Sequence, residues 1–149
     1  MGTTTILRAV TVAGFAISSG LLCFGALSAD SWRESYVFLP RERAVEDAVR
    51  QVAERQRSLH ETTGAFVNFA HSDVEADTGP IGLPWNNFPV SEFYFDAMAL
   101  DTGNIRLRAL PRPDAIRRLD VRARIFVSEI SPEGDVVQSG WLPPASVNP

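Results

Sequence analysis

The sequence predicts an α+β fold with one N-terminal transmembrane helix, an amphipathic helix, and a four-stranded antiparallel meander packed on that helix. Three patterns predict it. The chain begins with a long apolar run over residues 5–29. Apolar residues then recur at helical spacing over 45–59. Apolar and polar residues finally alternate over 91–141, in short segments divided by turn residues. One helix followed by several strands is typical of a two-layer α+β domain.

Length and composition limit the classes of function. The chain has 149 residues and a net charge of −4, which argues against a nucleic-acid partner. All 14 basic residues are arginine, a bias that we attribute mainly to codon composition. The single cysteine, Cys23, excludes an intrachain disulfide and leaves the redox compartment open.

The apolar run over 5–29 is long enough to span a membrane. As a helix it would rise roughly 37 Å, more than a hydrocarbon core of about 30 Å requires. Trp32 and Tyr36 follow it, as expected of aromatic side chains at a membrane–water boundary. We therefore expect an anchor and interfacial segment over 1–39 and an extracytoplasmic domain over 40–149.

A cleaved export signal is an alternative interpretation of this run, with small residues such as Ala26 and Ser28 before the cut. Orientation is a separate question. Arginines are more numerous after the run than before it, which alone would place the C-terminal side inside the cell. The signal-like shape of the segment favours export instead. The expected location is thus the bacterial inner membrane, with a single span and a periplasmic body.

The predicted helix begins near Pro40, which suits a first helical turn, and ends at Gly64. Its apolar stripe contains Val45, Val49, Val52, Gln56 and Leu59. Gln56 is either a buried, hydrogen-bonded glutamine or part of a partner surface. On the opposite face, Glu46 and Arg50 have the spacing of a favourable ion pair.

Residues 65–90 are predicted to be irregular because glycine and proline crowd the second half of this segment. Trp85 and Phe88 either pin the segment to the core or serve as anchors for a partner. The strands are predicted over 91–100, 104–110, 121–130 and 136–141, with a crossing loop or single helical turn over 111–120.

No constellation of residues indicates catalysis. The body has two histidines and no cysteine, which argues against zinc. The acidic residues around His71 lack the glycine and the final glutamate of a calcium loop, so a solvated acidic loop is favoured over a metal site. No G-x-S-x-G turn or phosphate-binding glycine loop occurs. We expect no enzyme activity, no cofactor and no metal.

Two stretches carry a family resemblance, AVEDAVRQVAERQRSLHETTGAFVNF at 44–69 and GDVVQSGW at 134–141. They resemble type IV pilins and pseudopilins, and the likeness covers about 41–141. It implies a pilin-like α+β body. A prepilin leader would be cut between Gly14 and Phe15, but Ser19 occupies the position where the family has glutamate. The chain also lacks the cysteine pair of the family's C-terminal loop.

The predicted function is that of a non-enzymatic, single-pass accessory or assembly subunit of a larger membrane protein complex. A pilin or pseudopilin subunit is the first alternative, and a secreted module that binds through its 79–90 loop is the second. Seven arginines over 106–124 form either a binding patch for lipid headgroups or an acidic partner, or a solvated face neutralised by the acidic helix. Small residues of the apolar run either pack against partner helices or merely fill the membrane. The candidate partner-binding residues are Gly14, Ser18, Gly25, Trp32, Tyr36, Trp85, Phe88, Arg112, Arg117 and Arg118.

Overall fold

The computed structural model describes residues 29–75, 81–118 and 120–143. The chain divides into two units, Met1–Val37 and Phe38–Pro149. Residues 29–33 are helical and are followed by a short π-helical segment, η1 (Glu34–Phe38). All the elements from α2 onward belong to the second unit.

The helix α2 (Leu39–Thr63) confirms the predicted amphipathic helix. Pro40 occupies its first turn, where the missing N–H is not needed. Gly64 ends the helix in the left-handed conformation, with φ of 75°, and its N–H donates to the carbonyl of His60 at 2.8 Å. Glycine adopts this backbone conformation without the strain that a Cβ atom would impose.

The predicted transmembrane helix requires a correction. In the described part of the chain, no helix combines the length and the apolar character needed to cross a membrane. The helix α2 has 25 residues, but charged side chains occur on nearly every turn. The predicted span lies almost entirely in residues 1–28, outside the described residues. The finding overturns the membrane part of the predicted fold class, the single-pass assignment and the inner-membrane location.

The predicted four-stranded antiparallel meander is confirmed. Its strands follow the order β1-β2-β3-β4, and each is antiparallel to its neighbour. Their bounds are β1 (Phe93–Ala99), β2 (Ile105–Pro111), β3 (Ile125–Ile130) and β4 (Val136–Leu142). The third strand begins later than predicted, because Arg124 N–H bonds to the carbonyl of Arg122 in a tight turn at 2.8 Å.

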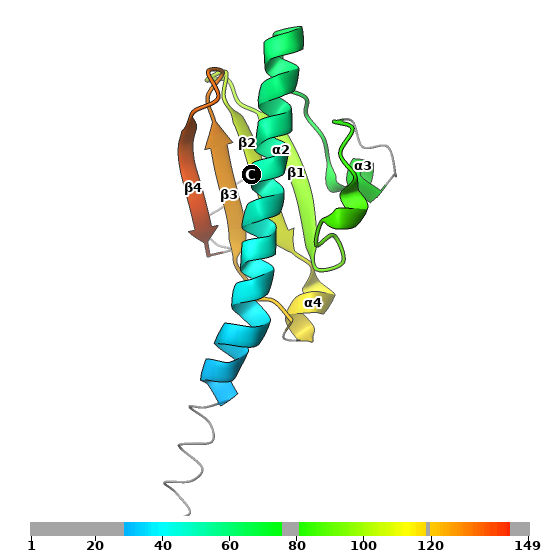
Figure 1. Cartoon of the computed structure of the whole chain (residues 1–149), viewed down its shortest axis with the longest axis vertical. Coiled ribbons are helices and arrows are strands. Elements are labelled where there is room, and N and C mark those ends of the chain that lie inside the picture. Colours follow the sequence, from blue (N-terminus) through cyan, green and yellow to red (C-terminus); the bar gives the residue numbers. More distant parts are fainter. Residues whose placement is uncertain (1–28, 76–80, 119, 144–149) are drawn as a thin grey trace, which may run out of the picture. The chain divides into compact units, whose positions relative to one another are not determined.

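The helix α2 lies across one face of the sheet, over β2 and β3 (Figure 1). Alternate residues of the central strands point toward it, among them Ile105 and Leu107, which are at most 1% exposed. On the helix, Val45, Val49 and Val52 face the sheet and are likewise buried. The two apolar patterns of the sequence therefore meet in one core.

Residues 65–90 contain more structure than predicted. The described part includes α3 (His71–Glu75) and a 3₁₀ turn, η2 (Trp85–Asn87). Phe69 pairs with Ala97 through two backbone hydrogen bonds of 3.1 and 2.9 Å, so it covers part of the free edge of β1. A last short helix, α4 (Pro113–Arg117), lies between β2 and β3, where the sequence predicted either a crossing loop or a single helical turn.

Candidate partner-binding site

The residues predicted to bind a partner are dispersed. Gly14, Ser18 and Gly25 lie outside the described residues. Trp32 and Tyr36 belong to the first unit, where their rings stack with centroids 5.8 Å apart and remain 57% and 69% exposed.

Trp85 and Phe88 lie in the core. They are 4% and 6% exposed, and their ring centroids are 5.0 Å apart. Trp85 also packs against Phe69 and Phe95, at centroid distances of 5.5 and 6.2 Å. The two aromatic residues therefore pin the 81–90 segment to β1, which is the first of the two predicted roles.

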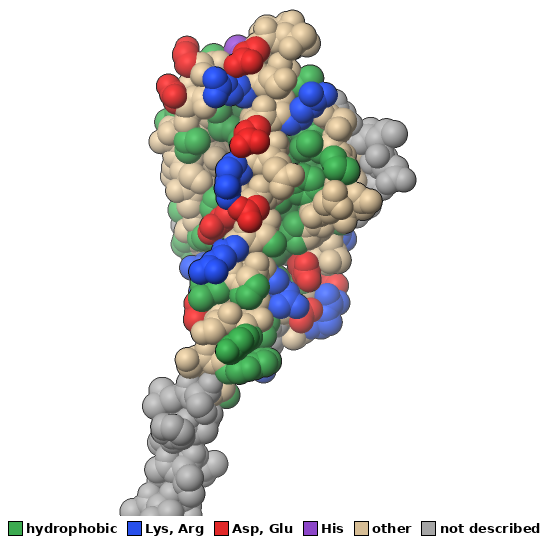
Figure 2. Space-filling view, in the orientation of Figure 1, with side chains coloured by type: hydrophobic (Ala, Val, Ile, Leu, Met, Phe, Trp, Pro, Cys, Tyr) green, Lys and Arg blue, Asp and Glu red, His purple; other side chains and the backbone are tan. Residues whose placement is uncertain are grey.

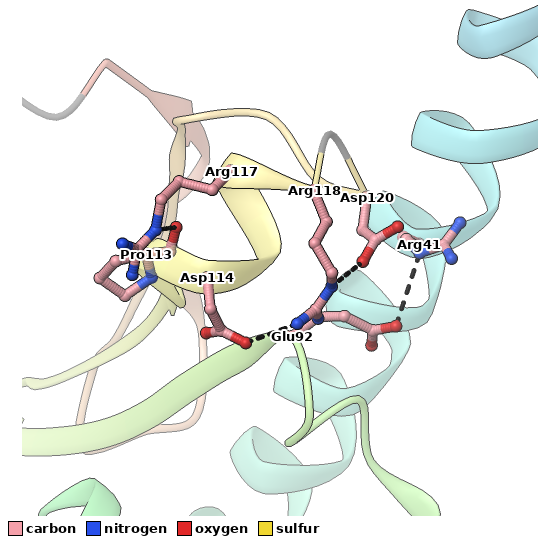
Figure 3. A network of polar contacts seen from close by, with 7 residues as sticks. All are labelled: Arg41, Glu92, Pro113, Asp114, Arg117, Arg118 and Asp120. Atoms are coloured by element: carbon pink, nitrogen blue, oxygen red, sulfur yellow. Dashed lines mark hydrogen bonds and ion pairs between the residues drawn. The ribbon is translucent and has the colours of Figure 1, made fainter.

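Arg117 and Arg118 lie on and just after α4. Figure 3 shows the Arg118 side chain between Asp114 and Asp120, and the Arg117 side chain beside Pro113. The Arg118 guanidinium bridges Asp114 and Asp120, at 2.8 Å to each carboxylate. The hydrogen bond from Arg118 lowers the pKa of Asp114 below its usual value. Arg117 is exposed, and its Nε donates to the carbonyl of Pro113 at 3.3 Å. Arg112, half-buried, places its guanidinium 4.2 Å from the centroid of the Tyr94 ring.

Further arginines of the predicted cluster contact carboxylates on other elements. Arg108 forms two hydrogen bonds with Asp96 of β1, of 2.8 and 2.9 Å, and this contact raises the pKa of the guanidinium. Arg106 pairs with Glu129 of β3 at 3.2 Å. Arg124 binds Glu42 of α2. Carboxylates of the neighbouring strands β1 and β3 thus neutralise Arg108 and Arg106, while the helix, which one of the two predicted alternatives made the source of neutralisation, supplies Glu42 to Arg124.

A groove of about 520 Å³ opens between α2 and the β3–β4 side of the sheet. It forms because α2 packs over β2 and β3 and leaves the outer strand β4 beyond its edge. Its surface is mainly apolar, and its lining includes Glu46, Val49, Ala53, Phe126, Val136 and Trp141.

Trp141 and Glu46 connect the two walls of this groove. The Trp141 indole Nε1 donates to Glu46 Oε1 at 2.9 Å, and its ring packs on Phe126 with centroids 5.2 Å apart. The predicted pair between Glu46 and Arg50 is wrong, because Glu46 accepts from Trp141 while Arg50 pairs with Asp47.

The strand β4 forms the open rim of the groove. It is an edge strand that contains no charged residue and no proline. Val136 and Val137 are 62% and 57% exposed at its start. Edge strands of monomeric proteins are usually protected by charges, prolines or covering segments, because their free N–H and C=O groups can pair with another strand. The other edge strand, β1, has Asp96 and the covering contact with Phe69.

The groove and the β4 edge together suit an extended peptide segment. An added strand could satisfy the free backbone groups of β4 while its side chains fill the apolar groove. Within the described residues, no three histidine, cysteine or acidic side chains gather as metal ligands. Asp73, from the acidic stretch around His71, accepts a hydrogen bond from Ala70 N–H at 2.8 Å.

The sequence patterns did not predict this site. The feature of the sequence that could have indicated it is the run VVQSGWL, which has no charged residue and begins with two adjacent valines. Its place at the edge of the sheet depends on the strand order, which periodicity does not reveal. No protein-family model matches the chain, and neither a known curated protein nor a solved structure matches it.

Proposed function

We propose that this protein is a non-catalytic accessory or assembly subunit that docks onto a partner protein through the β4 edge and the adjacent groove. The observation that carries the proposal is the exposed, uncharged edge of β4 beside an apolar groove. None of the described residues outside the sheet pairs with this edge through its backbone, and few monomeric proteins leave such an edge free, since it can pair with strands of other chains.

The occupant that fits this site is an extended, uncharged segment of the partner. Charged side chains in that segment would lose hydration against the apolar walls formed by Val49 and Phe126. The two charged residues that also line the groove, Glu46 and Arg50, already have partners in Trp141 and Asp47. Backbone hydrogen bonds to β4 would supply affinity. Alternate apolar side chains entering the groove would supply specificity.

The test is co-purification of the full-length protein with its partner from the native cell. We expect a complex of fixed stoichiometry for the unmodified chain. Val137→Lys, which puts a charge on the β4 edge, should abolish it. The matched control is Met98→Lys on β1, since Met98 is also partly exposed, at 41%, but belongs to the other edge.

Retention of the complex by Val137→Lys, or its loss in both variants, would contradict docking at β4. Recovery of the unmodified chain as a monomer without any partner would contradict the subunit role itself. Both variants should show unchanged circular dichroism, which separates lost docking from lost folding.

A pilin or pseudopilin subunit is the second candidate. The order of elements, one long helix followed by a meander with strands in consecutive order, supports it alongside the resemblance over 41–141. This candidate requires removal of the first 14 residues. An intact mass that begins at Phe15 with an added methyl group would favour it, and a mass that includes Met1 or Gly2 would exclude it.

A further inference from the structure

The solvent-facing stripe of α2 carries a regular alternation of charges. Its members recur at intervals of four and three residues, which places them on one line along the helix. The apolar residues that face the sheet lie on the opposite side. The stripe, hereafter the charge ladder, consists of Arg43, Asp47, Arg50, Glu54, Arg57 and Glu61. Figure 2 shows acidic and basic side chains alternating along this face of the body.

The ladder is exposed and only partly paired. Arg50 pairs with Asp47, and Arg57 pairs with Glu61 at 3.0 Å, with all four side chains more than half exposed. Arg43 and Glu54 make no hydrogen bond or ion pair within the described part of the chain. Pairing within the helix therefore accounts for four of the six charges and leaves one charge of each sign.

We propose that the charge ladder is a self-association surface, on which α2 of a second copy packs in the antiparallel direction to form a two-fold dimer. When the ladder is reversed, every charge meets one of the opposite sign. Arg43 lies opposite the second copy's Glu61, Asp47 opposite Arg57, and Arg50 opposite Glu54. Two-fold symmetry produces each of these pairs twice.

Other arrangements of two helices match less well. A parallel, in-register pair would place each charge opposite itself, which is repulsive along the whole ladder. A parallel pair shifted by one charge would leave the terminal charges unmatched and would not close. The neutral flank formed by Ala44, Gln51 and Ser58 adds no like-charge contact. The antiparallel arrangement therefore forms a closed dimer in which each of the six charges lies opposite a charge of the other sign.

The ladder spans 18 residue steps, from Arg43 to Glu61, or about 27 Å of helix. Exposed ion pairs each contribute little, so the dimer should be weak and sensitive to salt. We expect a dimer at about 0.1 M salt, where the electrostatic screening length is about 10 Å. At about 1 M salt, where the screening length is about 3 Å, we expect a monomer. Association through the apolar 5–29 run would not weaken with salt.

The first experiment is sedimentation velocity of the full-length chain in a non-ionic detergent at both salt concentrations. Arg43→Glu should weaken the dimer about tenfold at low salt, because two ion pairs become repulsive. Arg43→Glu combined with Glu61→Arg should restore it, because positions 43 and 61 face each other only in the antiparallel arrangement. These positions flank the groove-lining part of α2, so docking on β4 should survive in both variants.

The second experiment tests direction by cross-linking. In a Cys23→Ser background, chains with Arg43→Cys mixed with chains with Glu61→Cys should be joined by a short bis-maleimide reagent, while either variant alone should not. A monomer at low salt, a dimer indifferent to Arg43→Glu, a double variant no better than the single one, or cross-linking of one variant with itself would each overturn the proposal.

Discussion

The side-chain amide of Gln56 hydrogen-bonds to both backbone polar groups of Val67. Nε2 donates to the Val67 carbonyl at 2.7 Å, and the Val67 N–H donates to Oε1 at 2.9 Å. Gln56 is fully buried, and its two hydrogen bonds hold the segment that follows α2 against the helix. The prediction of a buried, bonded glutamine is confirmed, and a role for its side chain in a partner surface is excluded by its burial.

Replacing Gln56 by leucine should lower the free energy of unfolding. The substitution keeps an apolar side chain of similar size but leaves the Val67 N–H and C=O without their partner, at roughly 1–3 kcal/mol for each unsatisfied group. Urea unfolding monitored by circular dichroism measures the effect. The control is Gln51→Leu on the exposed side of the same helix, which should change stability by less than about 0.5 kcal/mol. Equal effects of the two substitutions would show that the Val67 contact contributes nothing.

Glu42 joins the first turn of α2 to the segment before β3. It is 8% exposed, bonds to Arg124, and lies 3.7 Å from Arg122. Glu42→Gln should destabilise the protein by about 1–3 kcal/mol, because it removes the charge that compensates two partly buried guanidinium groups. Thermal unfolding should detect the change. Glu54→Gln, measured at about 1 M salt, where the proposed dimer is dissociated, serves as the comparison. Glu54 is exposed and makes no hydrogen bond or ion pair with the residues that the structure describes.

The pair of Asp114 and Arg118 predicts a pH dependence of stability. The pKa of Asp114 is lowered in the folded state by its hydrogen bond with Arg118. Folding therefore favours the charged carboxylate, and this contribution is present above the unfolded-state pKa of about 3.9 and is lost as pH falls through the lower folded-state value. Asp114→Asn should lower the urea midpoint slightly at pH 7, and the difference from the unmodified protein should shrink as the pH falls below the unfolded-state pKa of about 3.9. A difference that persists at low pH would contradict the assignment.

Gly134 forms the turn between β3 and β4 with φ of 90°. A Cβ atom added there would lie 2.7 Å from Arg57 Cδ. Gly134→Ala should cost about 1–2 kcal/mol, because a residue with a Cβ atom is strained in the left-handed region. Adding Arg57→Ala relieves the contact but not the backbone strain, so most of the loss should remain in the double variant. Gly140→Ala is the control, since open space surrounds that position.

Much of the fold could be predicted because local periodicity records it directly. The stripe of Val45, Val49 and Val52 and the alternation in β1 and β2 each depend on neighbours within one element. The short helix α3, in the acidic stretch beginning at His71, was not predicted, because it has too few apolar residues to show a helical period. The membrane-spanning assignment depended on apolar length and on the aromatic residues that follow the run, and no helix among the described residues is long and apolar enough to span a membrane.

The candidate site could not be predicted because it depends on contacts between distant segments. Glu46 was assigned a partner four residues away, yet it accepts from Trp141, 95 residues away. Arg108 and Asp96 meet only through the register of β1 and β2. The groove exists because α2 lies over β2 and β3 and not over β4, and a lateral offset of this kind leaves no trace in hydrophobic spacing.

The consecutive order of the strands also has a consequence for folding. Each strand pairs only with its neighbour in the sequence, so the sheet can assemble through successive closures of short loops. Contact between α2 and β2 closes a longer loop, formed by residues 64–104. We therefore expect α2 to dock on the sheet late in folding. Until it docks, the uncharged strand β4 borders a sheet whose apolar face is uncovered. The early stages of folding are therefore when strands of different molecules would most readily pair and aggregate.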